Sequence, residues 1–272
     1  MRFELTISLI NLRRNVLPLN YQYELSSWIY SVLHSGNPEF AAWLHDHGYT
    51  DNRKQFRMFT FSNLDIPQRR IQGDRLEIMS REISMVVSML PDEMIRHFIT
   101  GLFQDQSFTL GDRLTQVPLK VISVEGIAGP LFSESMSFTS LSPLLISFKY
   151  PDDRYARYLA PDHPQYPALF FRNLKEKMQA YSGVDIPFDE KDGVLQILTE
   201  PRKKGILIKA GTPMESKIIG YQYDFRLTAP QELLRFGYYT GFGEKNSMGF
   251  GCVDLPARPS RFWKPERSDK KS

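Results

Sequence analysis

Hydrophobic and polar positions change their spacing several times along the first half of the chain. Strict alternation over residues 2–10 predicts a β-strand. In the following segment, LPLNYQYELSSWIYSVLHSG, apolar residues recur three and four positions apart, which predicts an amphipathic helix that ends at Gly36. A second, short helix is expected to start with Asn37 as its cap and to stop at Gly48.

The remainder of the first half is predicted to contain strands, one helix and one extended stretch. Strands are predicted at 56–63 and 75–80, a helix at 91–103 and an extended stretch at 107–125. The first half therefore has the predicted order β-α-β-β-α-β.

The second half repeats this order without any visible repeat of individual residues. Its expected elements are a strand at 136–150, a helix at 167–181, a hairpin of strands at 194–210 and 217–227, and a strand at 251–255. The helix before the last strand should begin with a capping box formed by Thr228 and Gln231. The duplication is thus inferred from the order of elements alone.

Two successive β-α-β-β-α-β units predict an α+β protein with two tandem ferredoxin-like (RRM-like) domains, each an antiparallel sheet with helices on one face. The N-terminal domain is expected over 1–127 and the C-terminal domain over 128–257. Residues 258–272 are expected to form a disordered, basic tail, because six basic and two acidic residues lie between Arg258 and Lys271.

Composition excludes some classes of protein. Hydrophobic residues make up 42% of the 272 residues and charged residues 24%, and no apolar run approaches the ~20 residues that span a bilayer. The opening strand lacks the cleavage site of a secretion signal. The single cysteine, Cys252, has no internal disulfide partner, which fits a reducing cytoplasm. The net charge of +3 is too small to indicate a partner.

The segment 237–251, GYYTGFGEKNSMGFG, contains five glycines. Glycines allow successive N–H groups to converge on an anion, so the segment is predicted to bind phosphate. A nucleotide cofactor is not expected, because Asn246 stands where both the Walker loop and the G-x-G-x-x-G pattern require a glycine after Gly241. The alternative is a tight helix-to-strand connection that needs positive φ angles.

Three segments together carry a resemblance to a known family: LPLNYQYELSSWIY, FAAWLH and GYYTGFGEKNSMGFGCV. They closely resemble the CRISPR-associated endoribonucleases that cut repeat RNA to release guide RNAs, the sixth Cas family in the RAMP superfamily. The resemblance implies two RRM-like domains, RNA cleavage without a metal or other cofactor, and CRISPR repeat RNA as the partner. It leaves open a multisubunit CRISPR interference complex and a homodimer.

The same resemblance implies the catalytic residues. In the family a Tyr, a His about fifteen residues later and a Lys shortly afterwards form the site, and Tyr30, His45 and Lys54 stand at corresponding places. His45 is expected to protonate the leaving 5′-oxygen, Tyr30 to position or help deprotonate the 2′-OH, and Lys54 to stabilise the charge at phosphorus. The acid and base roles could be reversed. The products would be a 2′,3′-cyclic phosphate and a 5′-OH.

Other interpretations of these residues compete with catalysis. His47 is the rival of His45, because it stands two residues away and the end of the helix is uncertain by one or two positions. Tyr30 could simply pack at the edge of the core, and Lys54 could belong to a solvated charge cluster. A metal site at His45 and His47 is disfavoured, because further ligands would have to come from elsewhere.

RNA contacts are expected in two places. Lys245 and Asn246 at the centre of the glycine segment are predicted to grip a phosphate and a base edge or 2′-OH. A second contact is predicted at the tip of the hairpin in the second half. The expected RNA-binding residues are Gly241, Gly243, Lys245, Asn246, Gly249, Gly251, Arg202, Lys203 and Lys204. The rival functions are a non-catalytic repeat-RNA-binding subunit and a structural subunit that mainly binds protein.

Overall fold

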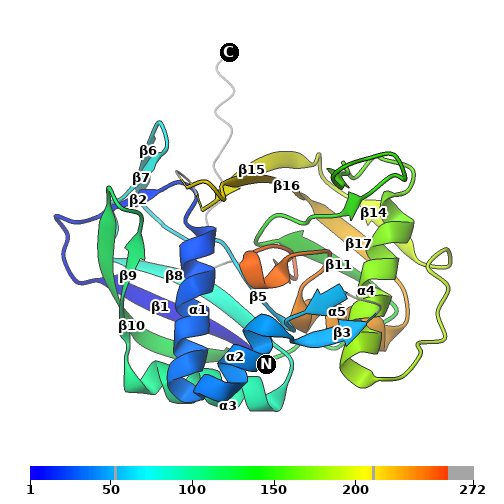
Figure 1. Cartoon of the computed structure of the whole chain (residues 1–272), viewed down its shortest axis with the longest axis horizontal. Helices are drawn as coiled ribbons and strands as arrows, with labels where there is room; N and C mark the ends of the chain where they lie inside the picture. Colours follow the sequence, from blue (N-terminus) through cyan, green and yellow to red (C-terminus); the bar gives the residue numbers. More distant parts are fainter. Residues whose placement is uncertain (52–53, 210–211, 257–272) are drawn as a thin grey trace.

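The structure is a computed structural model that describes residues 1–51, 54–209 and 212–256. Two halves lie side by side, with helices α1, α2 and α3 on the first half and α4 and α5 on the second (Figure 1). The basic tail expected over 258–272 lies outside the described residues. No helix in the described part of the chain is long and apolar enough to cross a membrane.

The first half is built on a five-stranded antiparallel sheet with the order β5-β8-β1-β10-β9. Its strands are β1 (Arg2–Leu9), β5 (Phe59–Phe61), β8 (Glu82–Met89), β9 (Ser107–Gly111) and β10 (Gln116–Ile127). Its helices are α1 (Gln22–Gly36), α2 (Pro38–Asp46) and α3 (Asp92–Gln104). If β1, β5, β8 and β10 are numbered one to four, the spatial order is 2-3-1-4, which is the ferredoxin-like arrangement.

The second half repeats this arrangement in a four-stranded sheet with the order β14-β17-β11-β18. Its strands are β11 (Ser135–Ser140), β14 (Val194–Ile197), β17 (Asp224–Thr228) and β18 (Val253–Asp254), and its helices are α4 (Tyr166–Ser182) and α5 (Gln231–Thr240). The predicted fold of two tandem ferredoxin-like domains is therefore confirmed. The first sheet ends at Ile127 and the second begins at Ser135, while the exact domain boundaries stay a prediction.

Smaller elements complete the fold. Three strands form a side sheet in the first half: β2 (Val16–Pro18), β6 (Arg69–Gln72) and β7 (Arg75–Ile78). Among the described residues, three further pairs of strands form two-stranded sheets: β3 (Tyr49–Asp51) with β4 (Lys54–Phe56), β12 (Ser147–Phe148) with β13 (Arg157–Tyr158), and β15 (Arg202–Ile208) with β16 (Ser216–Gln222). A 3₁₀ turn, η1 (Asn246–Met248), lies within the glycine segment.

Several local predictions were wrong. The third strand of the first domain is β8, which was not predicted, whereas the strand expected at 75–80 belongs to the side sheet. The strand expected over 136–150 is interrupted after Ser140. The predicted capping box is absent, because Pro230 occupies the N-cap of α5 and Thr228 lies in β17, where its hydroxyl donates to Ser135. By contrast, the cap at Asn37 is confirmed, since its side chain accepts from the N–H of Phe40 at 2.9 Å.

Helices α1 and α3 approach so closely that glycine is required where they touch. A Cβ atom at Gly36 would lie 1.9 Å from the carbonyl oxygen of His97, and one at Gly101 would lie 1.8 Å from that of Val32. Gly36 is the last residue of α1, as expected, but this close packing gives it a second role. The contact fixes the orientation of α1, which carries Tyr30.

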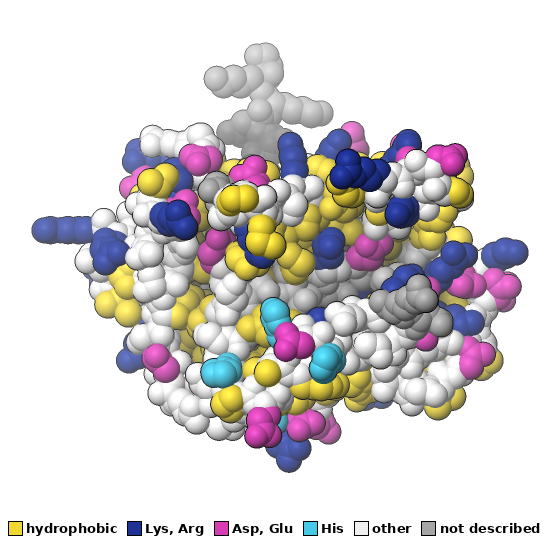
Figure 2. Space-filling view, viewed as in Figure 1, with side chains coloured by type: hydrophobic (Ala, Val, Ile, Leu, Met, Phe, Trp, Pro, Cys, Tyr) yellow, Lys and Arg dark blue, Asp and Glu magenta, His cyan; other side chains and the backbone are white. Residues whose placement is uncertain are grey.

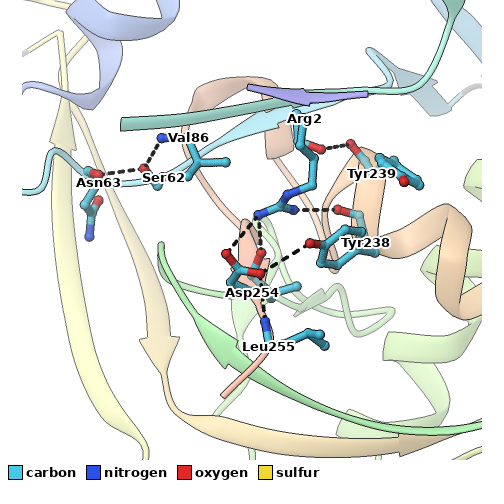
Figure 3. A network of polar contacts seen from close by, with 10 residues as sticks. Arg2, Ser62, Asn63, Val86, Tyr238, Tyr239, Asp254 and Leu255 are labelled. Atoms are coloured by element: carbon cyan, nitrogen blue, oxygen red, sulfur yellow. Dashed lines mark hydrogen bonds and ion pairs between the residues drawn. The ribbon is translucent and has the colours of Figure 1, made fainter. Parts of the chain in front are cut away.

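Arg2 joins the two halves (Figure 3). Its side chain comes from β1 and is fully buried, and its guanidinium donates to the carbonyl oxygens of Tyr238 at 3.0 Å and Val253 at 2.6 Å. The guanidinium also lies 4.1 Å above the Tyr238 ring and 4.0 Å from the Asp254 carboxylate. Apolar residues of both halves form one continuous core. The buried arginine and the shared core therefore hold the two halves together.

Candidate functional site

A cleft of about 890 Å³ lies between the two halves. Figure 1 shows α1 on one side, α4 on the other and the glycine segment between them. Figure 2 shows the same face hollowed between the halves, with Lys and Arg side chains around the hollow. The basic residues that line the cleft are Lys54, Arg57, Lys149, Arg172, Lys177 and Lys245. A cleft with these charges is suited to a polyanion.

His45 projects into this cleft from the last turn of α2. Its side chain is 71% exposed, and its Nδ1 lies 2.9 Å from the Asp46 carboxylate. That hydrogen bond is the main cause of the lowered pKa of Asp46. Because the carboxylate accepts from Nδ1, Nε2 is the ring atom left for a substrate. His47 is exposed but is not among the described residues that line the cleft. The geometry thus favours His45 over His47.

Tyr30 lies on α1, beside His45. The two rings pack edge to face with centroids 5.5 Å apart, and the Tyr30 ring makes a similar contact with Phe59. Burial raises the pKa of Tyr30, while hydrogen bonds from the side chains of Ser247 and Arg57 oppose this rise. The hydroxyl therefore lies near one residue of the glycine segment, Ser247, and one of the first domain, Arg57.

Lys54 forms an ion pair across the cleft with Glu176. Its Nζ lies 2.5 Å from Oε2 of Glu176, which comes from α4 in the second half. The Lys54 side chain is 54% exposed and that of Glu176 is 19% exposed. Lys54 lines the cleft, but its ammonium group is already paired with the Glu176 carboxylate, and its role in catalysis stays a prediction.

Arg57 is bound to the His45 segment and lies close enough to Tyr30 to lower the pKa of that tyrosine. Its Nη2 donates to the carbonyl oxygen of His45 at 2.6 Å and its Nη1 to that of His47 at 3.2 Å. Sequence reasoning missed this residue, because it looked like one of several charges next to Lys54. The glycine at Gly48 was a usable signal: a Cβ atom there would lie 2.5 Å from Nη1 of Arg57.

The centre of the glycine segment is organised by a buried lysine that sequence reasoning also missed. Nζ of Lys177 on α4 donates to the carbonyl oxygens of Gly241 at 2.7 Å and Gly243 at 3.1 Å, and to Oδ1 of Asn246 at 2.6 Å. Burial lowers the pKa of Lys177 to about 7. The segment therefore wraps around an amine of its own protein.

Asn246 takes part in the same internal network. Its Nδ2 donates to the carbonyl oxygens of Phe242 at 3.1 Å and Phe250 at 3.0 Å, and the residue is 8% exposed. With Oδ1 on Lys177, both ends of the amide are in use. The polar atoms of the Asn246 side chain are thus engaged within the protein, although the residue lines the cleft, and its contact with RNA stays a prediction.

The glycines of the segment also serve packing. Gly241, Gly243, Gly249 and Gly251 all have positive φ and are buried. A Cβ atom at Gly251 would lie 1.9 Å from the carbonyl oxygen of Phe242. The backbone N–H groups of Gly241, Gly249 and Gly251 also donate to carbonyl oxygens of the protein, so the glycine-rich spacing reflects a tight connection, and anion binding by the segment stays a prediction. Lys245 is the exposed residue among those predicted here to bind RNA, and its contact with RNA stays a prediction.

The glycine segment is tied to the first domain at Ser247. The carbonyl oxygen of Ser247 accepts from the Ser26 hydroxyl of α1 at 2.6 Å, and the Ser247 side chain lies near the Tyr30 hydroxyl. Thr60 of β5 also donates to the carbonyl oxygen of Phe250 at 2.9 Å. The segment therefore positions Tyr30 in addition to closing the cleft.

The basic trio Arg202, Lys203 and Lys204 is exposed but does not lie at a hairpin tip. These residues start β15 and pair with Gln222, Tyr221 and Gly220 of β16, at the end of the hairpin farthest from its turn. The expectation of a tip was wrong because the trio follows the end of β14 at Ile197 and starts a new strand, whose turn comes only after Ile208. RNA binding by the trio stays a prediction.

Comparison with known proteins identifies the family. The model of the N-terminal part of CRISPR-associated protein Cas6 matches residues 16–118, and that of the C-terminal part of CRISPR associated protein Cas6 matches residues 127–255. The CRISPR-associated endoribonuclease Cas6 1 of Methanocaldococcus jannaschii is 30% identical over 93% of this chain and 92% of its own length.

Solved structures agree with this match. The structure of a Cas6-related gene product from Pyrococcus furiosus has a TM-score of 0.80 and 26% identity, over 94% of this chain and 98% of that one. A structure described as a RAMP protein binding different RNA substrates has a TM-score of 0.78 and 25% identity, over 94% of this chain and 99% of that one. Sequence and fold together show that the chain belongs to the Cas6 family of CRISPR-associated proteins.

Proposed function

We propose that this protein is an endoribonuclease that cleaves CRISPR precursor RNA within its repeats to release guide RNAs. The name of the Methanocaldococcus jannaschii relative, an endoribonuclease, supports the class of reaction. We further propose that the cut is independent of metal, with attack of the 2′-OH on the adjacent phosphate. The products are then a 2′,3′-cyclic phosphate and a 5′-OH.

One observation carries the proposal. Tyr30 and His45 come from different helices and stand fifteen residues apart, yet their rings are 5.5 Å apart at the wall of a cationic cleft, and Arg57 contacts both segments. A titratable imidazole, a hydroxyl and a cation are the groups that such a transesterification needs.

The surroundings of each group support a role. His45 presents Nε2 to the cleft, so it protonates the 5′-oxygen that leaves, histidine being the side chain that exchanges protons near neutral pH. The raised pKa of Tyr30 keeps its hydroxyl protonated, which suits it to orient the 2′-OH more than to deprotonate it. Arg57 stabilises the charge that develops on the phosphate. Lys54 assists when it exchanges Glu176 for phosphate.

A cleavage assay in EDTA tests the reaction. The substrate is a repeat transcript, and the variants are His45→Ala and, as its matched control two residues away, His47→Ala. We expect His47→Ala to cut like the parent and His45→Ala to lose about two or more orders of magnitude in rate. Undiminished cutting by His45→Ala contradicts the assignment of the acid.

A second substrate tests the nucleophile. A repeat with 2′-deoxyribose at the cut position should bind but resist cleavage, because it lacks the attacking hydroxyl. Normal cutting of that substrate would rule out the 2′-OH mechanism. A parent protein that binds repeat RNA and leaves it intact would instead support the non-catalytic RNA-binding subunit.

A further inference from the structure

A second, smaller pocket adjoins the cleft on the side of the β12–β13 hairpin. It has a volume of about 450 Å³, and its aromatic and polar lining includes Tyr150, Tyr158 and His163. Its lining residues are separate from those of the cleft. Nothing in the reaction proposed above uses this pocket.

The two cavities share one wall. Phe148 lines the cleft and Tyr150 lines the second pocket, and their rings pack edge to face with centroids 4.7 Å apart. Lys149, the exposed residue between them, also lines the cleft. An RNA strand that leaves the cleft over this wall thus meets the second pocket next. Lys149 can bind one of its phosphates where the RNA passes over the wall.

The pocket has the features of a base-binding site. The Tyr150 ring is partly exposed, and the Arg157 guanidinium lies 5.4 Å from its centroid. Arg157 forms an ion pair with Asp153, so the negative charge of the Asp153 carboxylate beside the pocket is neutralised. An aromatic ring beside an arginine is a common platform on which single-stranded bases stack.

The polar rim can read the edge of a base. His163 accepts from the N–H of Gln165 through Nδ1 at 3.2 Å, so in the neutral ring the proton sits on Nε2. Nε2 lies 3.4 Å from the Tyr150 hydroxyl, a long contact that a better partner can replace. Asp162, also in the lining and exposed, supplies an acceptor.

Positive charge continues beyond the pocket. Asp162 faces Tyr221 closely enough to contribute, after burial, to the raised pKa of that tyrosine. Tyr221 is the register partner of Lys203, and paired residues on antiparallel strands point to the same side of the sheet. Lys203 of the exposed basic trio therefore lies on the same face of the hairpin as Tyr221, whose pKa the Asp162 carboxylate of the pocket helps to raise.

We propose that this pocket binds the base of a single-stranded nucleotide adjacent to the cleaved phosphate, stacked on Tyr150. The proposal rests on the proposed function, because the strand is the RNA held in the cleft. Lys149 and Lys203 contact its phosphates on either side. The β12–β13 hairpin is then an element that guides the RNA strand past the site of cleavage.

Binding measurements with an uncut repeat RNA, blocked by 2′-deoxyribose at the cut position, test the pocket. Tyr150→Ala should weaken binding by about five- to 150-fold, which corresponds to the about 1–3 kcal/mol that stacking of a base on an aromatic ring contributes. Tyr150→Phe should bind like the parent. The control is Tyr155→Ala on the same hairpin, where a 69% exposed tyrosine lies outside the pocket and should change binding less than twofold.

Shortened RNAs give a second readout. When the RNA is trimmed back to the cut position on the side that fills the pocket, the difference between Tyr150→Ala and the parent should disappear. Equal affinities of Tyr150→Ala and Tyr155→Ala for the full repeat, with binding and cleavage by the parent intact, would overturn the pocket and leave the proposed function standing. Failure of the parent to bind any repeat RNA would overturn both.

Discussion

Replacing Lys177 with methionine should destabilise the protein by an amount that grows with pH. The side chain is 2% exposed, and its amine donates to three oxygen atoms of the glycine segment. Methionine has a similar length but donates nothing, so these oxygens lose their partner inside the protein. Each lost hydrogen bond of this kind costs about 1–3 kcal/mol.

The dependence on pH follows from the lowered pKa. Burial shifts Lys177 from 10.5 to about 7, so between these values the unfolded state binds one more proton than the folded state. The free energy of unfolding of the parent therefore rises with pH in this window, by up to about 1.4 kcal/mol per pH unit. Below about pH 7 both states carry the ammonium, and its full desolvation cost is present.

The expected magnitudes follow. At pH 9 the amine is neutral in the folded protein, and Lys177→Met loses the two hydrogen bonds that such an amine can donate, which amounts to about 2–6 kcal/mol. Between pH 6.5 and pH 9 the destabilisation should grow by about 2–3 kcal/mol. Glu244 is half-buried, and its charge opposes the lowering of the Lys177 pKa, so its interaction with the ammonium is already contained in the value of about 7.

Urea unfolding at pH 6.5 and pH 9, at equal ionic strength, measures this difference. The matched control is Lys175→Met on the same helix, where Nζ donates to the carbonyl oxygen of Phe188 at 2.9 Å from a partly exposed position. The difference between the two variants isolates the buried amine. A destabilisation by Lys177→Met that is the same at both pH values would refute the argument from burial.

Three further predictions concern the glycine segment and the cleft. Gly251→Ala should lower the free energy of unfolding by about 2 kcal/mol more than Gly183→Ala. Both glycines have positive φ, but only at Gly251 would the added Cβ atom lie 1.9 Å from a carbonyl oxygen. Equal losses in the two variants would contradict this. Glu176→Gln should tighten repeat-RNA binding about two- to fivefold at low salt, because it releases Lys54, and unchanged affinity would count against the ion pair as a competitor of phosphate. Arg57→Ala should slow single-turnover cleavage at saturating RNA about 100-fold or more and should do so more than Lys54→Ala, whereas the reverse order would restore Lys54 as the main cation.

The fold was predictable wherever one face of an element is buried. The expected helices at the positions of α1, α3 and α4 and the first strand were found, because their apolar residues follow the helical or strand period. Strand β8 was missed because it is buried on both faces, so its sequence EISMVVSM shows no alternation. The break after Ser140 was missed although the sequence carries a signal for it: Pro143 stands three residues later, and proline is confined to the edges or ends of strands.

The candidate site was predictable only in part, because contacts between distant segments leave little trace in a single sequence. Tyr30 and His45 were found through resemblance to a family, and the structure brings them together. Lys177 did leave a trace: it stands seven and three residues after Phe170 and Leu174, which places it on the buried stripe of α4. A lysine on an apolar stripe is a reason to expect a buried partner.

The network around Lys177 connects stability to catalysis. Lys177 holds Asn246, and the next residue, Ser247, is bound to α1 and lies near the Tyr30 hydroxyl. In the proposed mechanism, a glycine segment that loses its internal amine therefore releases a group beside the tyrosine that orients the attacking 2′-OH, while the exposed lysines and arginines proposed to hold the RNA are untouched. Damage at Lys177 should thus appear in the rate of cleavage and hardly in the affinity for RNA. The segment that looks like a phosphate cradle then acts chiefly by holding a tyrosine of the other domain.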